Sequence, residues 1–168
     1  MEKLKRFLLS KSGMGIFSLT AAATAALVCF LIGFSIQIII KSAVLAFLLS
    51  LSSAIDIKTR ELDNAFPFSV FFLSFSFVSL SDVPFILSGA LLGLLVTLIP
   101  ALSKSESVGG ADIKMCMALG AFLGPVKVAL SIIIAITAAL IYGKVRKVKS
   151  IPLIPFLFFG VLPTLFLP

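Results

Sequence analysis

The chain has 168 residues, of which 60% are hydrophobic and only 12% are charged. Soluble domains are roughly half apolar and a quarter charged, so this composition excludes an ordinary water-soluble fold. The net charge of +7 does not indicate a nucleic-acid-binding protein, because the basic residues form short clusters between apolar runs, where they orient membrane segments. There is no histidine, and Cys29 and Cys116 are far apart. The sequence therefore predicts no metal site and no cofactor, and both cysteines are expected to be buried apolar residues.

The apolar residues lie in seven runs. A run of roughly 20 apolar residues crosses a bilayer core of about 30 Å as a helix, whereas a membrane β-barrel needs alternating strands. We therefore predict an all-α polytopic membrane protein with a bundle of six or seven transmembrane helices. The second and fifth runs are too short to cross alone, and the last contains four prolines, which is typical of a bent or partial helix. The expected segments are 13–40, 43–55, 65–80, 84–102, 113–124, 126–142 and 151–168.

The N-terminus resembles a secretory signal in one respect, since four basic residues precede the first apolar run. The run from Gly13 to about Ile40 is too long for a signal sequence, however, and no small-residue cleavage site follows it. We therefore predict a retained first helix.

The distribution of lysine and arginine predicts the orientation in the membrane. Twelve of the 14 basic residues fall in connections on the side of the N-terminus, and only Lys41 and Lys127 fall on the other side. The positive-inside rule then predicts a cytoplasmic N-terminus in the inner cell membrane, with cytoplasmic loops around Arg60, Ser107 and Lys147.

Two aspartates, Asp56 and Asp112, each adjoin an apolar segment on this cytoplasmic side. A carboxylate there is costly unless it is paired or hydrated. We expect Gly109 and Gly110 to let the backbone bend and pack closely, so that the helix of Asp112 approaches a partner. Two carboxyl groups in a partly desolvated site share a proton, so one acts as a base toward water and the other as an acid toward a carbonyl. Such a pair is suited to hydrolysing a peptide bond.

A plainer interpretation of these aspartates is also open. Loop aspartates beside lysines commonly mark the membrane border as solvated charges. We interpret Glu61, Asp63, Asp82 and Glu106 in this way, and spacing alone leaves both interpretations open for Asp56 and Asp112.

Two motifs around these aspartates resemble those of the type IV prepilin peptidases. The stretch DIKTRELDN at 56–64 resembles their first motif, an aspartate followed by basic residues and an asparagine. The stretch GGADIK at 109–114, continued by ALGAFLG at 118–124, resembles the second, which names the wider Gly-x-Gly-Asp group of aspartyl proteases. The group also includes the archaeal preflagellin peptidases. Ala111 stands where the motif has glycine, and Asp63 stands where many members have proline.

This resemblance covers residues 43–160 and implies a membrane-embedded aspartic endopeptidase. Its members remove short basic leader peptides from pilin-like or flagellin-like precursors at the cytoplasmic membrane face. We expect one peptidase domain over 1–168, with an extra N-terminal helix in 1–42 and the core in 43–160. Nothing matches the cysteine-rich methylase domain of larger members, so the chain is similar to short forms. The implied site comprises Asp56 and Asp112 as catalytic residues, supported by Lys58, Asn64, Gly109, Gly110, Ala111 and Lys114.

Other functions remain alternatives at this point. A small transporter or proton relay would also use intramembrane carboxylates such as Asp56 and Asp112. A structural partner within a secretion complex would need neither aspartate. The presenilin-like branch of the group is disfavoured, because Ile55 stands before Asp56 where that branch prefers tyrosine.

Overall fold

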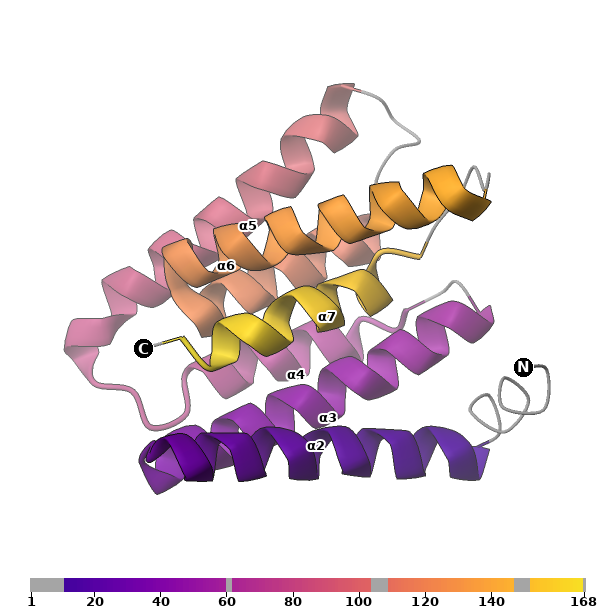
Figure 1. Ribbon diagram of the computed structural model, residues 1–168. Coiled ribbons are helices and arrows are strands. Elements are labelled where there is room, and N and C mark those ends of the chain that lie inside the picture. The colour runs from indigo at the N-terminus through magenta and orange to yellow at the C-terminus, as the bar shows by residue number, and fades with distance from the viewer. Residues whose placement is uncertain (1–10, 60–61, 104–108, 147–151, 168) are drawn as a thin grey trace.

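A computed structural model of the chain describes residues 11–59, 62–103, 109–146 and 152–167 (Figure 1). These ranges fold into helices joined by turns, and four of the helices are long and apolar enough to cross a membrane. The predicted helical membrane protein is therefore confirmed. The elements are α2 (Lys11–Ile32), α3 (Ile36–Thr59), α4 (Ala65–Ser74), the short 3-10 helix η1 (Leu80–Asp82), α5 (Val83–Ser103), α6 (Gly110–Arg146) and α7 (Ile154–Leu165).

The first apolar run does not form one helix. It breaks at Gly33, whose φ of +86° lies in the left-handed region that favours glycine. The N–H of Phe34 bonds the carbonyl of Cys29 across this turn, 3.1 Å away, and closes α2. The predicted boundary near residue 41 was wrong because the turn is flanked by apolar residues. As a result α3 reaches 24 residues, enough to cross a membrane.

Helix α4 is shorter than expected. It has 10 residues, whereas an apolar segment over 65–80 was predicted. The chain leaves α4 at Ser74, and Phe77 adopts a positive φ of 53° in the following turn. Asp82 then accepts a hydrogen bond from the backbone N–H of Ser79 at 3.2 Å and caps η1. Hydropathy did not show this end because the turn at 75–77 contains two phenylalanines and no charged residue. The last helix, α7, has 12 residues and also falls short of a span. The predicted count of six or seven crossings thus exceeds the four helices of spanning length in the described residues.

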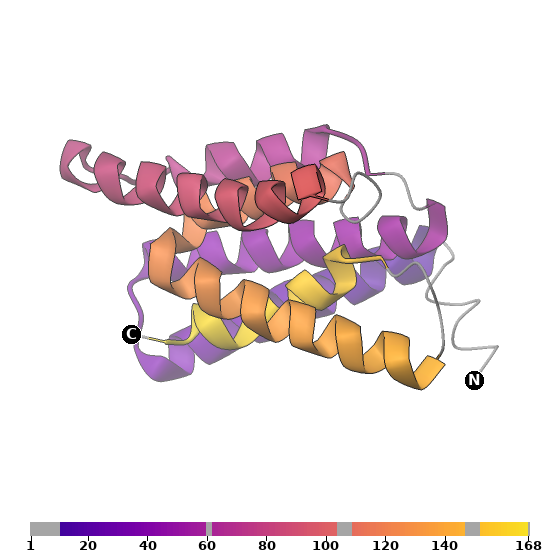
Figure 2. The ribbon, with the colours of Figure 1, turned by 90° about the horizontal axis from the view of Figure 1, so that it is seen from above.

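Helix α6 is bent sharply at Gly124. Its backbone there is non-helical, with φ 78° and ψ 175°, and Pro125 follows. The halves 110–123 and 125–146 form a V, so the chain reverses its course across the bundle (Figures 1 and 2). This bend falls between the predicted segments 113–124 and 126–142, and the expected break there is confirmed.

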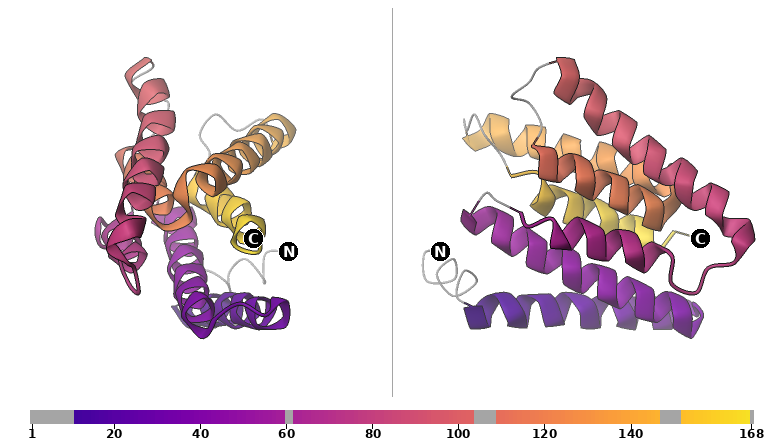
Figure 3. Two further views of the ribbon diagram at one scale, coloured as in Figure 1. Left: turned by 90° about the vertical axis from the view of Figure 1, so that its left-hand side faces the viewer. Right: turned by 180° about the vertical axis from the view of Figure 1, so that it is seen from behind.

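The termini of the helices gather at two opposite ends of the bundle (Figures 1 and 3). One end holds the start of α2, the end of α3, both ends of α6 and the start of α7. The α2–α3 turn, the α4–α5 connection, the bend of α6 and the end of α7 lie at the other. The basic residues of the described ranges follow this division. Lys11, Lys58, Lys114, Lys144 and Arg146 belong to the first end, whereas Lys41 and Lys127 belong to the opposite end.

The core joins α3, α4, α6 and α7. Both α4 and α7 pack against α3 and α6 and so hold those two long helices in fixed relation. The outer surface is strongly apolar, with Leu31 73%, Leu102 78% and Leu140 68% exposed, as suits helices facing lipid hydrocarbon. The fully buried side chains of the core include Leu45, Leu49, Val70, Met115, Leu119, Val128, Leu157 and Val161.

Candidate active site

The two predicted catalytic aspartates lie at the first end of the bundle. Asp56 is in the last turns of α3 and is buried, with only 8% of its surface exposed, on a helix that also buries Ser52 and Ser53. Asp112 is in the first turn of α6 and is partly exposed. One carboxyl group is therefore sheltered by the bundle, while the other faces its rim.

The turn before α6 fixes the position of Asp112. The carbonyl of Gly109 accepts hydrogen bonds from the N–H groups of Asp112 and Ile113, at 3.1 and 3.3 Å, and so starts the helix. The carboxyl group folds back over this turn, because a Cβ atom added at Gly109 would lie 3.3 Å from Asp112 Oδ2. A helix N-terminus carries partial positive charge, which stabilises a carboxylate placed there.

The fold brings Asp56 and Asp112 together although they are far apart in the sequence. Asp56 lies close enough to Asp112 for the two carboxyl groups to interact electrostatically. The helices that carry them are held by the shared neighbours α4 and α7. The two carboxyl groups therefore form an interacting pair, one buried and one accessible, at the same end of the bundle. Such a pair has the components for general acid and general base chemistry.

A second contact ties the two motifs to each other. Lys114 Nζ donates a hydrogen bond to Asn64 Oδ1 at 2.8 Å, from the start of α6 to the residue before α4. Both residues were predicted to support the site, and the structure brings them together. Lys58, the third polar residue of the predicted set, is exposed at the end of α3. Beside Lys114 lies an apolar cavity of ≈ 90 Å³, lined by Pro67, Phe68, Phe71, Lys114 and Met117.

The packing role expected of Gly109 and Gly110 was wrong. Both glycines are exposed. Among the described residues, a Cβ atom at Gly110 would meet nothing within 4 Å, and one at Gly109 would meet only the Asp112 side chain. Their place in the site, and that of the partly buried Ala111, stays a prediction.

The close packing occurs instead between α5 and the first half of α6. A Cβ atom at Gly89 would collide with the carbonyl of Gly120, and one at Gly120 would collide with the carbonyl of Gly89. One turn away, Gly93 lies against the backbone of Cys116 in the same way. The spacing Gly-x-x-x-Gly at 89–93 is the pattern that lets membrane helices approach closely, and sequence analysis missed it. This contact fixes the helix that presents Asp112.

The cysteines behave as expected of small apolar residues. Cys29 and Cys116 are free thiols, and both are buried. Cys29 contacts the hydroxyl of Ser42 at 3.1 Å between α2 and α3, whereas Cys116 belongs to the core. No cluster of three or more histidine, cysteine or acidic side chains able to hold a metal occurs in the described ranges.

Comparison with known proteins assigns the family. Residues 43–144 match the Type IV leader peptidase family, which covers more than half of the chain and includes both aspartate motifs. No curated protein and no solved structure gives a significant match. The apolar helices and this match together make the chain a membrane protein of a peptidase family. The resemblance inferred from the two motifs is therefore confirmed: the chain belongs to the type IV leader peptidase family.

Proposed function

We propose that this protein is an aspartic endopeptidase in which Asp56 and Asp112 act together to remove short basic leaders from prepilin-like or preflagellin-like precursors. The proposal depends on one observation: these two aspartates lie near each other at one end of the bundle, and one is buried while the other is partly exposed. Family membership supplies the class of reaction, and the aspartate pair supplies groups able to perform it.

The proposed reaction is direct attack by water. One carboxylate takes a proton from a water molecule as the water oxygen bonds to the carbonyl carbon of the scissile peptide. The other carboxyl group donates a proton to the carbonyl oxygen, giving a neutral tetrahedral diol. Collapse of the diol breaks the C–N bond and returns a proton to the leaving amine. The products are a leader ending in a carboxylate and a precursor with a new N-terminus.

The position of the pair supports a peptidase over the alternative of a proton relay. A relay across the membrane requires titratable groups distributed along a path. Asp56 and Asp112 lie at the same end of the bundle, and the acidic residue described near the opposite end, Asp82, is exposed at the surface. A surface-proximal hydrolytic site fits this arrangement better than a through-path.

Substrate recognition is proposed to come mainly from the apolar helix that follows the leader. The exposed Asp63 is available to attract a basic leader residue, but such a surface ion pair contributes only about 0–1 kcal/mol. Glu61, the other acidic residue between Asp56 and Asn64, lies outside the described residues. Burial of an apolar helix against the bundle offers much more contact area.

The test of this function is cleavage in reconstituted membranes. Purified protein in liposomes should release the leader from a full precursor, detected as a shortened product by intact mass. A soluble leader peptide without its apolar helix should be cut at least about tenfold more slowly, because it loses the proposed helix contacts. Equal rates for the two substrates would contradict helix docking, and failure to cut any precursor of this class would contradict the function.

The orientation is a separate proposal with its own test. Ser107 lies outside the described residues, in the connection that leads to the Asp112 helix, whereas Ser81 is exposed in η1 near the opposite end. We expect a membrane-impermeant maleimide to label Ser81→Cys in intact cells and Ser107→Cys only after the membrane is opened. The reverse pattern would place the aspartates on the outer face.

A further inference from the structure

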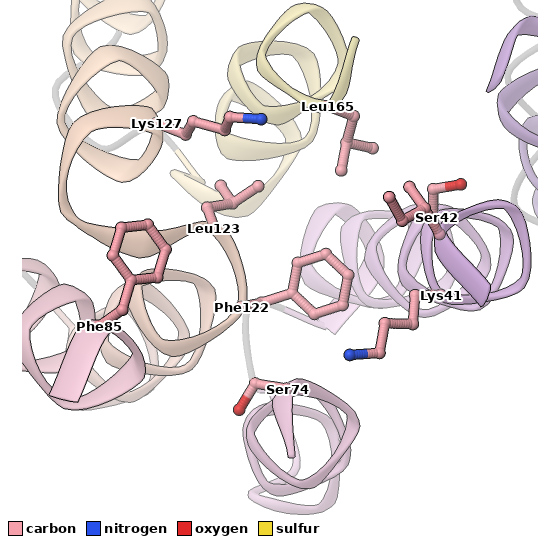
Figure 4. A pocket seen from close by; sticks show the side chains of 9 residues that line it. Lys41, Ser42, Ser74, Phe85, Phe122, Leu123, Lys127 and Leu165 are labelled. Atoms are coloured by element: carbon pink, nitrogen blue, oxygen red, sulfur yellow. The ribbon is translucent and has the colours of Figure 1, made fainter. Parts of the chain in front are cut away.

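A cavity of ≈ 280 Å³ opens near the end of the bundle opposite the aspartates. It lies where five helices meet, beside the bend of α6 (Figure 4). Polar and apolar side chains share its wall. The lining residues are Ile38, Lys41 and Ser42 from α3, Ser74 from α4, Phe85 from α5, Phe122, Leu123 and Lys127 from α6, and Leu165 from α7.

The polar part of the cavity is cationic. Lys127 extends from α6 toward α7, and Lys41 extends from α3 toward Ser74 of α4, so both ammonium groups border the cavity (Figure 4). Lys127 Nζ donates a hydrogen bond to the carbonyl of Leu167 at 2.7 Å, which holds the ammonium group at the cavity while leaving further donors. None of the described residues that line the cavity is acidic, and Asp82, which lies near enough to Lys41 to interact with it electrostatically, is outside the cavity wall. The surplus positive charge favours an anion.

The lysines have a simpler explanation, which the geometry disfavours. Lysines near a helix end commonly extend outward to reach the membrane surface. Lys41 and Lys127 instead line one cavity together, although they come from different helices. They are also the two basic residues that depart from the charge bias of the rest of the chain.

The remaining wall determines what kind of anion fits. Ile38, Phe85 and Leu165 are apolar, and the surrounding surfaces of α3 and α5 are apolar and exposed, with Ile40 47% and Leu87 55% exposed. A small hydrated anion gains nothing from such walls, whereas an amphiphile places its charged group at the lysines and its chain against the apolar side chains. Basic pockets between membrane helices bind the head groups of anionic lipids in this way.

We propose that this cavity binds the phosphate group of an anionic phospholipid between Lys41 and Lys127, with an acyl chain along α3 and α5. The lipid contacts helices on both sides of the α6 bend and thereby fastens α3 to α6 at the end remote from the aspartates. The site is independent of the proposed proteolysis, and its test needs no substrate.

Lipid retention by the full-length protein tests the proposal. Protein in nanodiscs of phosphatidylcholine with a minor share of phosphatidylglycerol is released into detergent, and retained lipid is counted by native mass spectrometry. Wild type should retain phosphatidylglycerol in preference to phosphatidylcholine. Lys41→Gln or Lys127→Gln should each lower that preference about fivefold, and the double variant should lower it about thirtyfold. Each substitution removes one ammonium group that contacts the phosphate.

Charge-matched controls distinguish a specific lipid-binding site from non-specific attraction of anionic lipid to a basic protein. Lys144→Gln removes an exposed lysine of α6 near the other end and should leave the preference unchanged. The Lys41→Arg/Lys127→Arg variant keeps both charges and should retain most of it. Equal retention by wild type and the double Gln variant, or equal loss in Lys144→Gln, would overturn the proposal.

Two further arms cover the source of the phosphate and the folding of the variants. Inorganic phosphate in excess should not displace the retained lipid; displacement would assign the site to the free anion instead. A photoactivatable phosphatidylglycerol on wild type should label the peptides containing Phe85, Phe122 or Leu165. Because this arm uses no variant, labelling confined to other peptides would overturn the proposal even if the lysine variants failed to fold.

Discussion

Replacing either Asp56 or Asp112 by asparagine should lower the rate of leader removal by about a thousandfold or more. Asparagine keeps the size and much of the hydrogen bonding of aspartate but has no titratable proton. Without one member of the pair, no group remains to complete water activation and carbonyl protonation. Because the two act as a unit, the double variant should be little slower than either single variant.

Folding should survive these changes, so the loss is assignable to chemistry. Removing a charge from a buried position such as Asp56 relieves a desolvation cost. The controls are Asp63→Asn and Asp82→Asn, both exposed, in which the amide oxygen can still accept the bonds now made from the N–H groups of Ala65 and Ser79. Glu106→Gln, outside the described residues, is a third control. Substantial cleavage by Asp56→Asn or Asp112→Asn at matched protein levels would contradict the mechanism.

Replacing Gly120 by alanine should lower the unfolding temperature by about 10 °C, through a loss of about 3 kcal/mol. The added methyl group would collide with the carbonyl of Gly89, which is backbone and cannot rotate away. Only separation of α5 from α6 relieves the clash. Gly89→Ala should have a similar effect, and the pair should be less than additive because both changes disturb one contact.

The two native thiols provide the measurement. Cys116 is buried in the core, and its backbone lies against Gly93 of α5, whereas Cys29 lies between α2 and α3. On heating, Gly120→Ala should expose Cys116 to a thiol reagent at a lower temperature than Cys29. Gly15→Ala is the matched control, because its methyl group meets nothing within 4 Å in the part of the chain that the structure describes. Equal stability of the Gly120 and Gly15 variants would show that α5 and α6 do not pack as described.

Hydropathy identified the helices but could not locate every boundary. In a soluble protein charged and polar residues mark the turns, whereas in this chain no charged residue stands in the turns at Gly33 and Phe77 and apolar residues predominate there. The break at Gly124 was predictable because proline follows it at once and the apolar run is long. The short α4 was expected to be longer for the same reason that the turns were missed, whereas the four prolines of the last run had already indicated a partial helix such as α7.

The two aspartates could be chosen from motif spacing, but their neighbours required coordinates. The Asn64–Lys114 hydrogen bond depends on how α4 packs on α6. The role expected of Gly109 and Gly110 belongs to Gly89, Gly93 and Gly120, and the Gly-x-x-x-Gly spacing at 89–93 was a signal that the sequence did contain. Lys41 and Lys127 share a cavity only because α6 reverses at Gly124, which no charge count reveals.

The central claim is that two carboxyl groups together activate water and hold the resulting diol, and a transition-state mimic tests it most directly. A precursor whose scissile amide is replaced by a hydroxyl-bearing isostere should bind the reconstituted protein at least about a hundredfold more tightly than the uncleaved precursor. That advantage should disappear in both Asp56→Asn and Asp112→Asn, which lack the shared proton. Cleavage of the normal precursor, combined with no tighter binding of the isostere by wild type, would contradict catalysis by the aspartate pair.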